Sequence, residues 1–354
     1  MPTLEARGAR PTFLVEDDVQ PALAEGLQDL AIRETADGLA TLSASFSNWG
    51  EVDGATGYLH ADRRVLDFGK PIAVELAGAS VFKGRIMALE GEYREGAPPS
   101  LTVLADDRLQ DLRMTRRTRS FERHSDRDVF DVVARDHGLR ARLDLTGPTW
   151  PVIAQLNQSD LAFLRERARL CGAELWVEDD TLHACGRADR GRAPLRLERG
   201  VHVREFRCLA DLAHQSTCVV VSGWDPQAKR RVDHAAGDEA LGAELGADRS
   251  GAALLRAARG ERRQSIVHTL PLTDQEAESH ARAAFCAAAR RFVCGEGRAE
   301  PSPELQVGRR VELAGFGATF DGCYVLVEVC HRFDGVLGLR TEFRVERPGV
   351  GGAA

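Results

Sequence analysis

The chain has 354 residues, and at about 150 residues per domain this length predicts two to three domains. Hydrophobic residues make up 43% and charged residues 29%, which is typical of globular proteins and excludes wholesale disorder or a fibrous design. Forty-seven Lys and Arg against 54 Asp and Glu give a net charge of −7. The chain therefore lacks the cationic field on which non-specific nucleic-acid binding depends, and we expect no nucleic-acid partner.

The N-terminal sequence and the cysteine content predict where the chain is made. Its start, MPTLEARGAR, has charges where a secretory signal needs an apolar core, and no stretch approaches the roughly 18 apolar residues of a membrane helix. Eight cysteines are too few for a disulfide scaffold, which predicts free thiols in a reducing compartment. We expect a cytoplasmic chain without a membrane anchor.

Residues 1–110 are expected to form a first β domain. The stretch from Leu27 to Phe46 alternates on either side of Asp37-Gly38, as a hairpin does. Further strands are predicted at 72–76, 80–89 and 101–104, because Gly and Pro turn signals separate these apolar runs.

Residues 111–200 are expected to form a middle α+β module. It opens with five arginines in residues 113–123, which we interpret as a solvated connection between domains, with an acidic-partner patch as the alternative.

Two similar helices follow in this module, 34 residues apart. Ser125 and Ser159 each begin one, and Gly138 and Gly172 stand where left-handed helix caps belong. Two copies with an extended segment between them do not make a helical repeat array. Residues 173–185 alternate as a further hairpin.

Residues 201–347 are expected to form a second β domain with a helical excursion at about 236–295. A capping box at Thr273 and Glu276 begins the main helix of this excursion, which we expect to end at Gly295. Residues 348–354 are predicted to be a flexible tail.

An internal repeat relates the two β regions. The five residues from Val74 to Gly78 recur identically from Val311 to Gly315. The matched positions are Gly69, Val74, Gly78, Phe82, Gly84 and Glu90 in the first copy, and Gly308, Val311, Gly315, Phe320, Gly322 and Glu328 in the second. We predict two copies of one strand–turn–strand unit. A trimer of such chains would present six similar modules, and could match a sixfold ring on one face and a threefold object on the other.

Four long motifs resemble the phage late control gene D family, which includes tail-hub proteins of contractile phages and the N-terminal part of VgrG spikes. These motifs are SDLAFLRERARLCGAELWVEDDTLH, VVVSGWDPQAKRRV, EAESHARAAFCAAARRFVCGEG and LQVGRRVELAGFGATFDGCYVLVEVCHRFD. The resemblance covers roughly residues 12–347. It implies an α+β, mostly β fold with two related tube-like β-barrels and the middle module.

The same resemblance implies a homotrimeric hub that lies between a hexameric inner tube protein and a trimeric spike, in contact with other baseplate proteins. VgrG-type chains continue into an oligonucleotide/oligosaccharide-binding fold and a triangular β-helix, whereas this sequence ends just after its second β region. We therefore expect the spike to be a separate polypeptide.

The residues that resemble catalytic or metal sites have simpler explanations. Cys323 and Cys330-His331 are the most metal-like cluster, but cysteines seven apart on a strand face opposite sides. Glu312 with Glu328 resembles a glycosidase pair, yet counterparts in the first copy, Glu75 and Glu90, favour a structural role. We predict no catalytic, cofactor or metal residues.

The sequence thus predicts a non-enzymatic baseplate hub subunit, assembled in the cytoplasm into a contractile injection system or phage-tail-like particle. The alternative is a particle-associated cell-wall hydrolase, which the absence of a convergent acid, base or nucleophile set disfavours. A transcriptional regulator is suggested only by the family's historical name, and no helix-turn-helix pattern is evident. Phage, injection-device and type VI settings all remain open.

Overall fold

The computed structural model describes residues 10–52, 54–60, 62–190 and 193–351. Its helices are α1 (Pro21–Gly26), α2 (Leu109–Arg113), α3 (Asp126–Asp136), α4 (Asp160–Cys171), α5 (Gly251–Arg259), α6 (Asp274–Ala289) and the 3-10 turns η1 (Arg187–Asp189) and η2 (Asp238–Glu244).

The strands of the first β region and the middle module come first in the chain. They are β1 (Thr12–Val15), β2 (Asp18–Val19), β3 (Leu27–Thr35), β4 (Thr41–Ser47), β5 (Gly50–Val52), β6 (Ala55–Gly57), β7 (Pro71–Leu76), β8 (Ala79–Glu92), β9 (Ser100–Asp106), β10 (Arg116–His124), β11 (Arg140–Asp144), β12 (Trp150–Ser159), β13 (Ala173–Glu178) and β14 (Thr181–Gly186).

The remaining strands belong to the second β region and its excursion. They are β15 (Leu195–Glu198), β16 (Val203–Ala210), β17 (Cys218–Asp225), β18 (Arg230–Ala236), β19 (Arg249–Ser250), β20 (Arg263–Ile266), β21 (Val293–Ala299), β22 (Arg310–Ala314), β23 (Gly322–Asp334), β24 (Gly338–Arg347) and β25 (Gly349–Val350).

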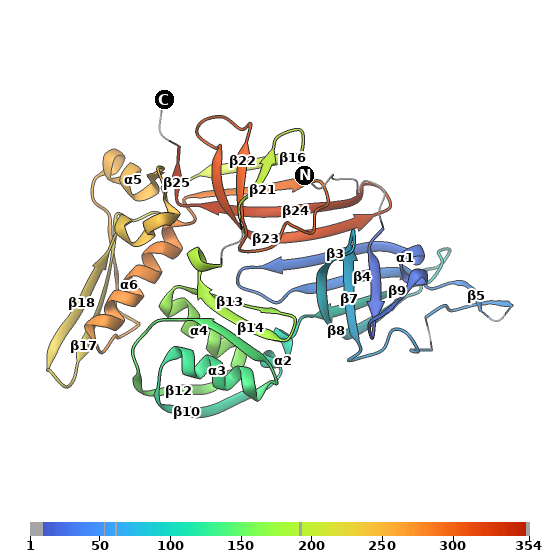
Figure 1. Cartoon of the computed structure of the whole chain (residues 1–354), viewed down its shortest axis with the longest axis horizontal. Helices are drawn as coiled ribbons and strands as arrows, with labels where there is room; N and C mark the ends of the chain where they lie inside the picture. The colour runs from blue at the N-terminus through green and yellow to red at the C-terminus, as the bar shows by residue number, and fades with distance from the viewer. Residues whose placement is uncertain (1–9, 53, 61, 191–192, 352–354) are drawn as a thin grey trace.

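The expected α+β, mostly β fold class is confirmed, but the two β regions share one sheet. Its 13 strands follow the order β16-β21-β24-β23-β3-β4-β9-β8-β7-β1-β2, with β22 and β15 attached beside β23 (Figure 1). The order is open at both ends, so the described strands form no closed barrel. The two β regions share this sheet because β23 pairs antiparallel with β3 and so joins them edge to edge.

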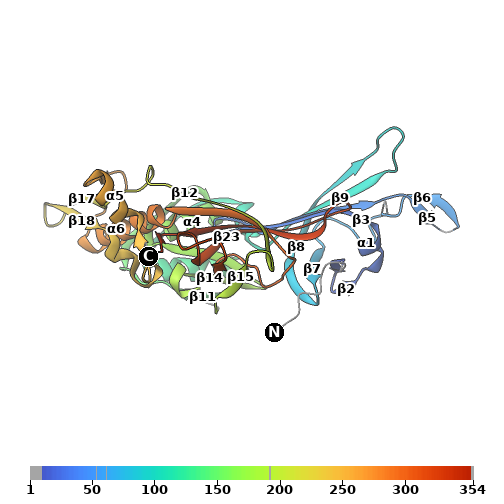
Figure 2. The ribbon, with the colours of Figure 1, turned by 90° about the horizontal axis from the view of Figure 1, so that it is seen from above.

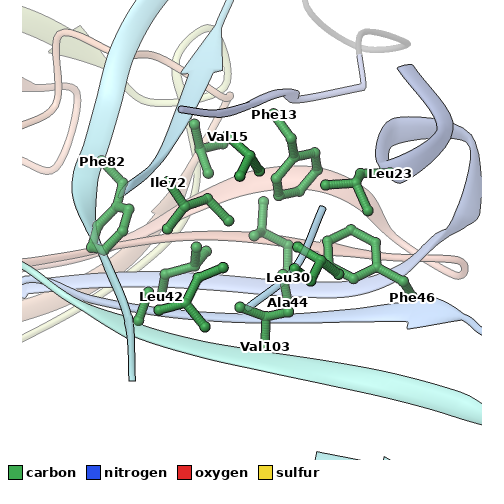
Figure 3. Packing of buried hydrophobic residues seen from close by; sticks show 14 of the residues in the cluster. Phe13, Val15, Leu23, Leu30, Leu42, Ala44, Phe46, Ile72, Phe82 and Val103 are labelled. Atoms are coloured by element: carbon green, nitrogen blue, oxygen red, sulfur yellow. The ribbon is translucent and has the colours of Figure 1, made fainter. Parts of the chain in front are cut away.

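Alternating side chains build the core of the first β region. In β4, Leu42, Ala44 and Phe46 are buried and the residues between them are half-buried, which is the period of two that a strand imposes. Phe46 packs edge-to-face on Phe13 with 5.2 Å between ring centroids, and Figure 3 shows both rings among the buried aliphatic side chains of this cluster.

The helical excursion lies against a separate small sheet, β18-β17-β20 (Figure 1). Thr273 and Glu276 form the predicted capping box of α6. The helix ends at Ala289 rather than at Gly295, because the chain turns there and residues 293–299 form β21. The expected tail is partly ordered, since β25 pairs with β19, while residues 352–354 lie outside the described residues.

The middle module contains the two predicted capped helices. Ser125 forms a capping box with Asp128, Ser159 accepts a hydrogen bond from the Ala162 N–H, and Gly172 takes the left-handed conformation at φ 70°. The preceding strands β10 and β12 pair with each other, whereas β11 runs parallel to β14, which also pairs with β13.

The arginine-rich segment is not a solvated connection. Residues 116–124 form β10, which pairs along its length with β12. Arg119 lies 2.6 Å from Asp136 and 2.9 Å from Asp160, and Arg117 lies 3.3 Å from Asp160. The arginines were misassigned because their acceptors lie up to 43 residues further along the chain, which local composition does not reveal.

Each capped helix begins with a buried aspartate held by the rest of the module. Asp126 accepts bonds from Arg167 at 2.5 and 3.0 Å. Asp160, 1% exposed, accepts bonds from Arg119, His137 and Gln155 at 2.8–2.9 Å. Burial acts to raise the pKa of Asp160, but the His137 and Gln155 hydrogen bonds and the arginine charges outweigh it, so that the pKa lies below its ordinary value.

Replacing Asp160 with Ala is expected to lower the free energy of unfolding by about 3 kcal/mol, because Arg119, His137 and Gln155 all lose the buried acceptor that they share. Chemical denaturation measures the loss. The matched control is Asp131→Ala, which removes an exposed ion pair with Arg135 and is expected to cost under about 0.5 kcal/mol.

The pH dependence of the same contact has a defined sign. Because folding lowers the pKa of Asp160, its stabilising contribution is present above the ordinary aspartate pKa and is lost as the pH falls through the lower folded value. The stability difference between the native chain and Asp160→Asn should therefore shrink on acidification. A difference that grows on acidification would contradict this assignment.

Candidate functional site

The structural feature that most clearly points to function is a duplicated five-stranded unit. The first unit has the strand order β3-β4-β9-β8-β7, and the second has β16-β21-β24-β23-β22. Matching neighbours pair antiparallel in both units. The repeated arrangement is thus larger than the strand–turn–strand unit predicted from the sequence.

The two units also share two register shifts at matching places, whereas the shift between β7 and β8 after Val74 has no counterpart between β22 and β23. A register shift follows Leu27 where β3 pairs with β4, and one follows Val203 where β16 pairs with β21. Another follows Ile86 where β8 pairs with β9, and one follows Leu326 where β23 pairs with β24. Because each bulge adds a residue at one defined place, two bulges at matching places are strong support for duplication.

The strand pairings align the two units differently from the sequence repeat, with an offset of two residues. Ile72 pairs with Gly84 in the first unit, and the equivalent pair in the second is Val311 with Tyr324. Val74 is thus the structural counterpart of Leu313 rather than of Val311. A shift of two keeps every side chain on the same face, so Val74 and Val311 are both fully buried.

The predicted repeat residues lie along one hairpin in each unit. Gly69 and Gly308 are true counterparts, each with positive φ and an N–H donating 2.7 Å to the opposite strand, at Ile86 or Leu326. The other repeat residues do not occupy equivalent strand positions, because the two copies are offset by two residues. They are Gly78, Phe82, Gly84 and Glu90 in the first unit, and Gly315, Phe320, Gly322 and Glu328 in the second.

The turns explain the offset between the two hairpins. Ala77 and Gly78 form a tight turn, both with positive φ, whereas the second hairpin is connected by the longer segment 315–321. The identical VELAG letters therefore occupy strand positions that differ by two.

The second half of β23 joins the two units. Its residues 328–334 pair antiparallel with residues 29–35 of β3, from Glu328–Thr35 to Asp334–Asp29. An ion pair of 2.6 Å between Arg33 and Glu328 crosses this junction, and Phe333 packs against the core of the first unit.

Within the two five-stranded units, two strand edges remain unpaired among the described residues. They are the second half of β8, which lies beyond its pairing with β7, and the side of β16 that faces away from β21. Figure 2 shows the end of the β8–β9 hairpin extending away from the body of the molecule. Open backbone edges of this length are templates for pairing with another chain.

A cavity of about 690 Å³ lies where both β regions meet the middle module. Several ionisable groups that line it have protein partners: Lys83 lies 2.6 Å from Asp179, and Asp107 accepts bonds from the Ala40 and Leu109 N–H groups at 2.9 Å. Burial raises the pKa of Asp107 to about 7 although these bonds oppose the shift. The Lys83–Asp179 contact thus joins the first β region to the middle module beside the cavity.

The residues considered for catalysis or metal binding lie in structural contacts. His331 is buried, its Nδ1 is 3.0 Å from the Thr341 hydroxyl, and burial lowers its pKa to about 4. Cys323 is exposed and Cys330 half-buried. Glu328 lies within 3.3 Å of both Arg33 and Arg344.

Glu75 lies opposite Ser80 and Glu312 opposite Cys323. Within the ranges that the structure covers, no group of three or more His, Cys, Asp or Glu side chains is placed to hold a metal ion. No helix in those ranges is long and apolar enough to cross a membrane.

Solved structures show the class of fold. A 43 kDa tail protein of prophage MuSo2 from Shewanella oneidensis is 14% identical, with a TM-score of 0.71 over 96% of this chain and 98% of that one. A tail protein from Neisseria meningitidis is 13% identical, with a TM-score of 0.69 over 97% of both chains. A type VI secretion component of E. coli is 12% identical, with a TM-score of 0.57 over 98% of this chain and 78% of that one. The fold is therefore that of phage tail and type VI secretion proteins.

The chain belongs to the Alg8 N-terminal domain family, whose model matches residues 68–334. No curated protein matches the sequence significantly. The expected kinship with tail and type VI proteins is confirmed at the level of fold, whereas membership of the late control gene D family stays a prediction.

The register of the β23–β3 junction can be tested within the chain. The Ala36 N–H donates to the Val327 carbonyl at 2.8 Å, and by the alternation of antiparallel pairs Arg33 and Cys330 form a non-hydrogen-bonded pair with close Cβ atoms. We expect Arg33→Cys to form an intrachain disulfide with Cys330 on mild oxidation. Peptide mapping by mass spectrometry detects it. Ala31→Cys, which lies opposite Arg332, is the control and should leave Cys330 free.

Proposed function

We propose that the chain is a structural subunit of the baseplate hub of a contractile injection system or phage-tail-like particle. The supporting observation is the duplication: one chain carries two units with the same strand order and the same two bulges, side by side in one sheet. Three such chains supply six equivalent units, which fit a sixfold ring while the chain as a whole keeps threefold symmetry.

In this proposal the hub is a homotrimer that adapts a hexameric inner tube to a trimeric spike carried on a separate chain, and it contacts other baseplate proteins. Residues 1–110 and 201–347 supply the six units, and residues 111–200 lie outside them as a threefold set. Assembly takes place in the cytoplasm. The fold shared with prophage tail and type VI secretion proteins supports this role.

The duplicated unit favours assembly over catalysis as the role of the chain. The buried Asp107 and His331 are paired with protein groups, and the two open edges offer backbone donors and acceptors to a partner. A particle-associated cell-wall hydrolase remains the alternative function, and release of soluble fragments from peptidoglycan by the purified chain would establish it.

Sedimentation of the purified chain tests the proposal. We expect a species of three times the 38.6 kDa chain mass that dissociates on dilution. A monomer at every concentration, or a dimer, would contradict the hub assignment. The exposed substitution Asp131→Ala, on a helix of the middle module, should leave the trimer intact.

A further inference from the structure

We infer that the open half of β8 pairs with the open edge of β16 from a second copy of this chain, in the register that β23 and β3 already use within the chain. This inference rests on the proposed trimer and specifies its contact. The two unit equivalences fix the register without an adjustable choice, because β8 corresponds to β23 and β16 corresponds to β3.

The template is the internal junction. There Cys330 lies opposite Arg33 and His331 opposite Ile32. Replacing each residue by its counterpart in the other unit places Glu90 opposite Leu209 and Gly91 opposite Cys208 of the second copy. The same register places Glu92, the last residue of β8, opposite Arg207. Pairing that extends past the end of β8 places Tyr93 opposite Phe206 and Arg94 opposite Glu205.

Charge supports this register independently of the backbone match. Glu92 would meet Arg207, and Arg94 would meet Glu205, so that both directly opposed charged pairs have opposite signs. A slip by two residues would place Glu92 opposite Glu205, which costs energy.

Within one chain these groups form surface ion pairs, either within the segment after β8 or between β16 and β21. Arg94 lies 2.5 Å from Glu92, Glu205 lies 2.6 Å from Arg298, and Arg207 lies 3.9 Å from Glu296. Surface pairs of this kind contribute little to stability and leave the side chains available to a partner.

Apolar exposure marks the same two edges. Tyr93, the first residue after β8, is 66% exposed and touches Tyr58 edge-on, and Leu209 is 63% exposed on β16. The counterpart of Tyr93 is Phe333, which packs across the internal junction onto the core of the neighbouring unit. In the proposed contact, Tyr93 of one copy would lie against Phe206 of the second copy. Phe206 stacks with Phe343 of its own chain at 6.2 Å between ring centroids.

The consequence is a continuous sheet. The β23–β3 junction within each chain would alternate with the β8–β16 junction between chains, and closure after three copies would leave neither edge exposed. The two junctions would use corresponding strands, because β8 corresponds to β23 and β16 corresponds to β3.

Cysteine cross-linking tests the register. Glu90 and Leu209 correspond to the close pair Cys330 and Arg33, so the double variant Glu90→Cys/Leu209→Cys should form intermolecular disulfides, up to a covalent three-chain species that thiol reductant dissolves. Cys294 lies opposite Leu209 on β21 and is replaced by Ser in all variants. The shifted pair Glu92→Cys/Leu209→Cys and each single variant are the controls.

Charge reversal gives a second measurement that does not depend on disulfide geometry. Glu92→Arg and Arg207→Glu should each shift the concentration of half-dissociation of the trimer upward by roughly tenfold, and the double variant should restore it. Trimers whose shifted pair cross-links better, or whose double charge variant is not rescued, would overturn the inference and leave the hub proposal standing. A chain that stays monomeric would overturn both.

Discussion

The antiparallel pairing of β23 with β3 is the contact on which the architecture depends. It joins two five-stranded units that would otherwise each end in an open edge, and it sets their relative position along seven residue pairs. Arg33 and Glu328 contribute an ion pair to it, and Phe333 carries apolar surface across it. Because both units have the same strand order, one such junction also defines how further units can be added.

The middle module is stabilised by a different device, two aspartates buried at helix starts. Asp126 and Asp160 occupy matching places 34 residues apart and each accepts a bond from at least one arginine. Arg187 joins this module to the second β region, since it lies 2.6 Å from Glu174 and 2.9 Å from Glu346. Burial acts to raise the pKa of Glu174, and the charges of Arg187 and Arg190 more than offset it, so its pKa is lowered. Ionic contacts thus position the module on the sheet.

Sequence patterns predicted the elements well where the signal is local. The capping residues Ser125, Ser159 and Thr273 fix three helix starts, because a cap depends on neighbours three residues away. The shared sheet was not predictable in this way, since the partners β23 and β3 are about 300 residues apart. The arginines of β10 were misassigned for the same reason: Asp160 becomes their neighbour only after folding.

Matching identical residues in the sequence detected the repeat but did not align its two copies correctly. Identical residues at Val74 and Val311 revealed the duplication, yet the structural counterpart of Val74 is Leu313. A strand tolerates a slip of two because each face keeps its character, so sequence identity and structural equivalence can diverge by that amount. The extent of the unit, and both of its open edges, become visible only from the strand pairings.

Hydrogen exchange of the backbone amides tests the central claim most directly, because it reports strand pairing at each edge. The account predicts that amides on the outer edges of β16 and of the second half of β8 exchange quickly in the dilute monomer and slowly in the assembled oligomer. The amides between β23 and β3 should be protected in both states. Assembly that leaves the β8 and β16 edges in fast exchange would contradict the account.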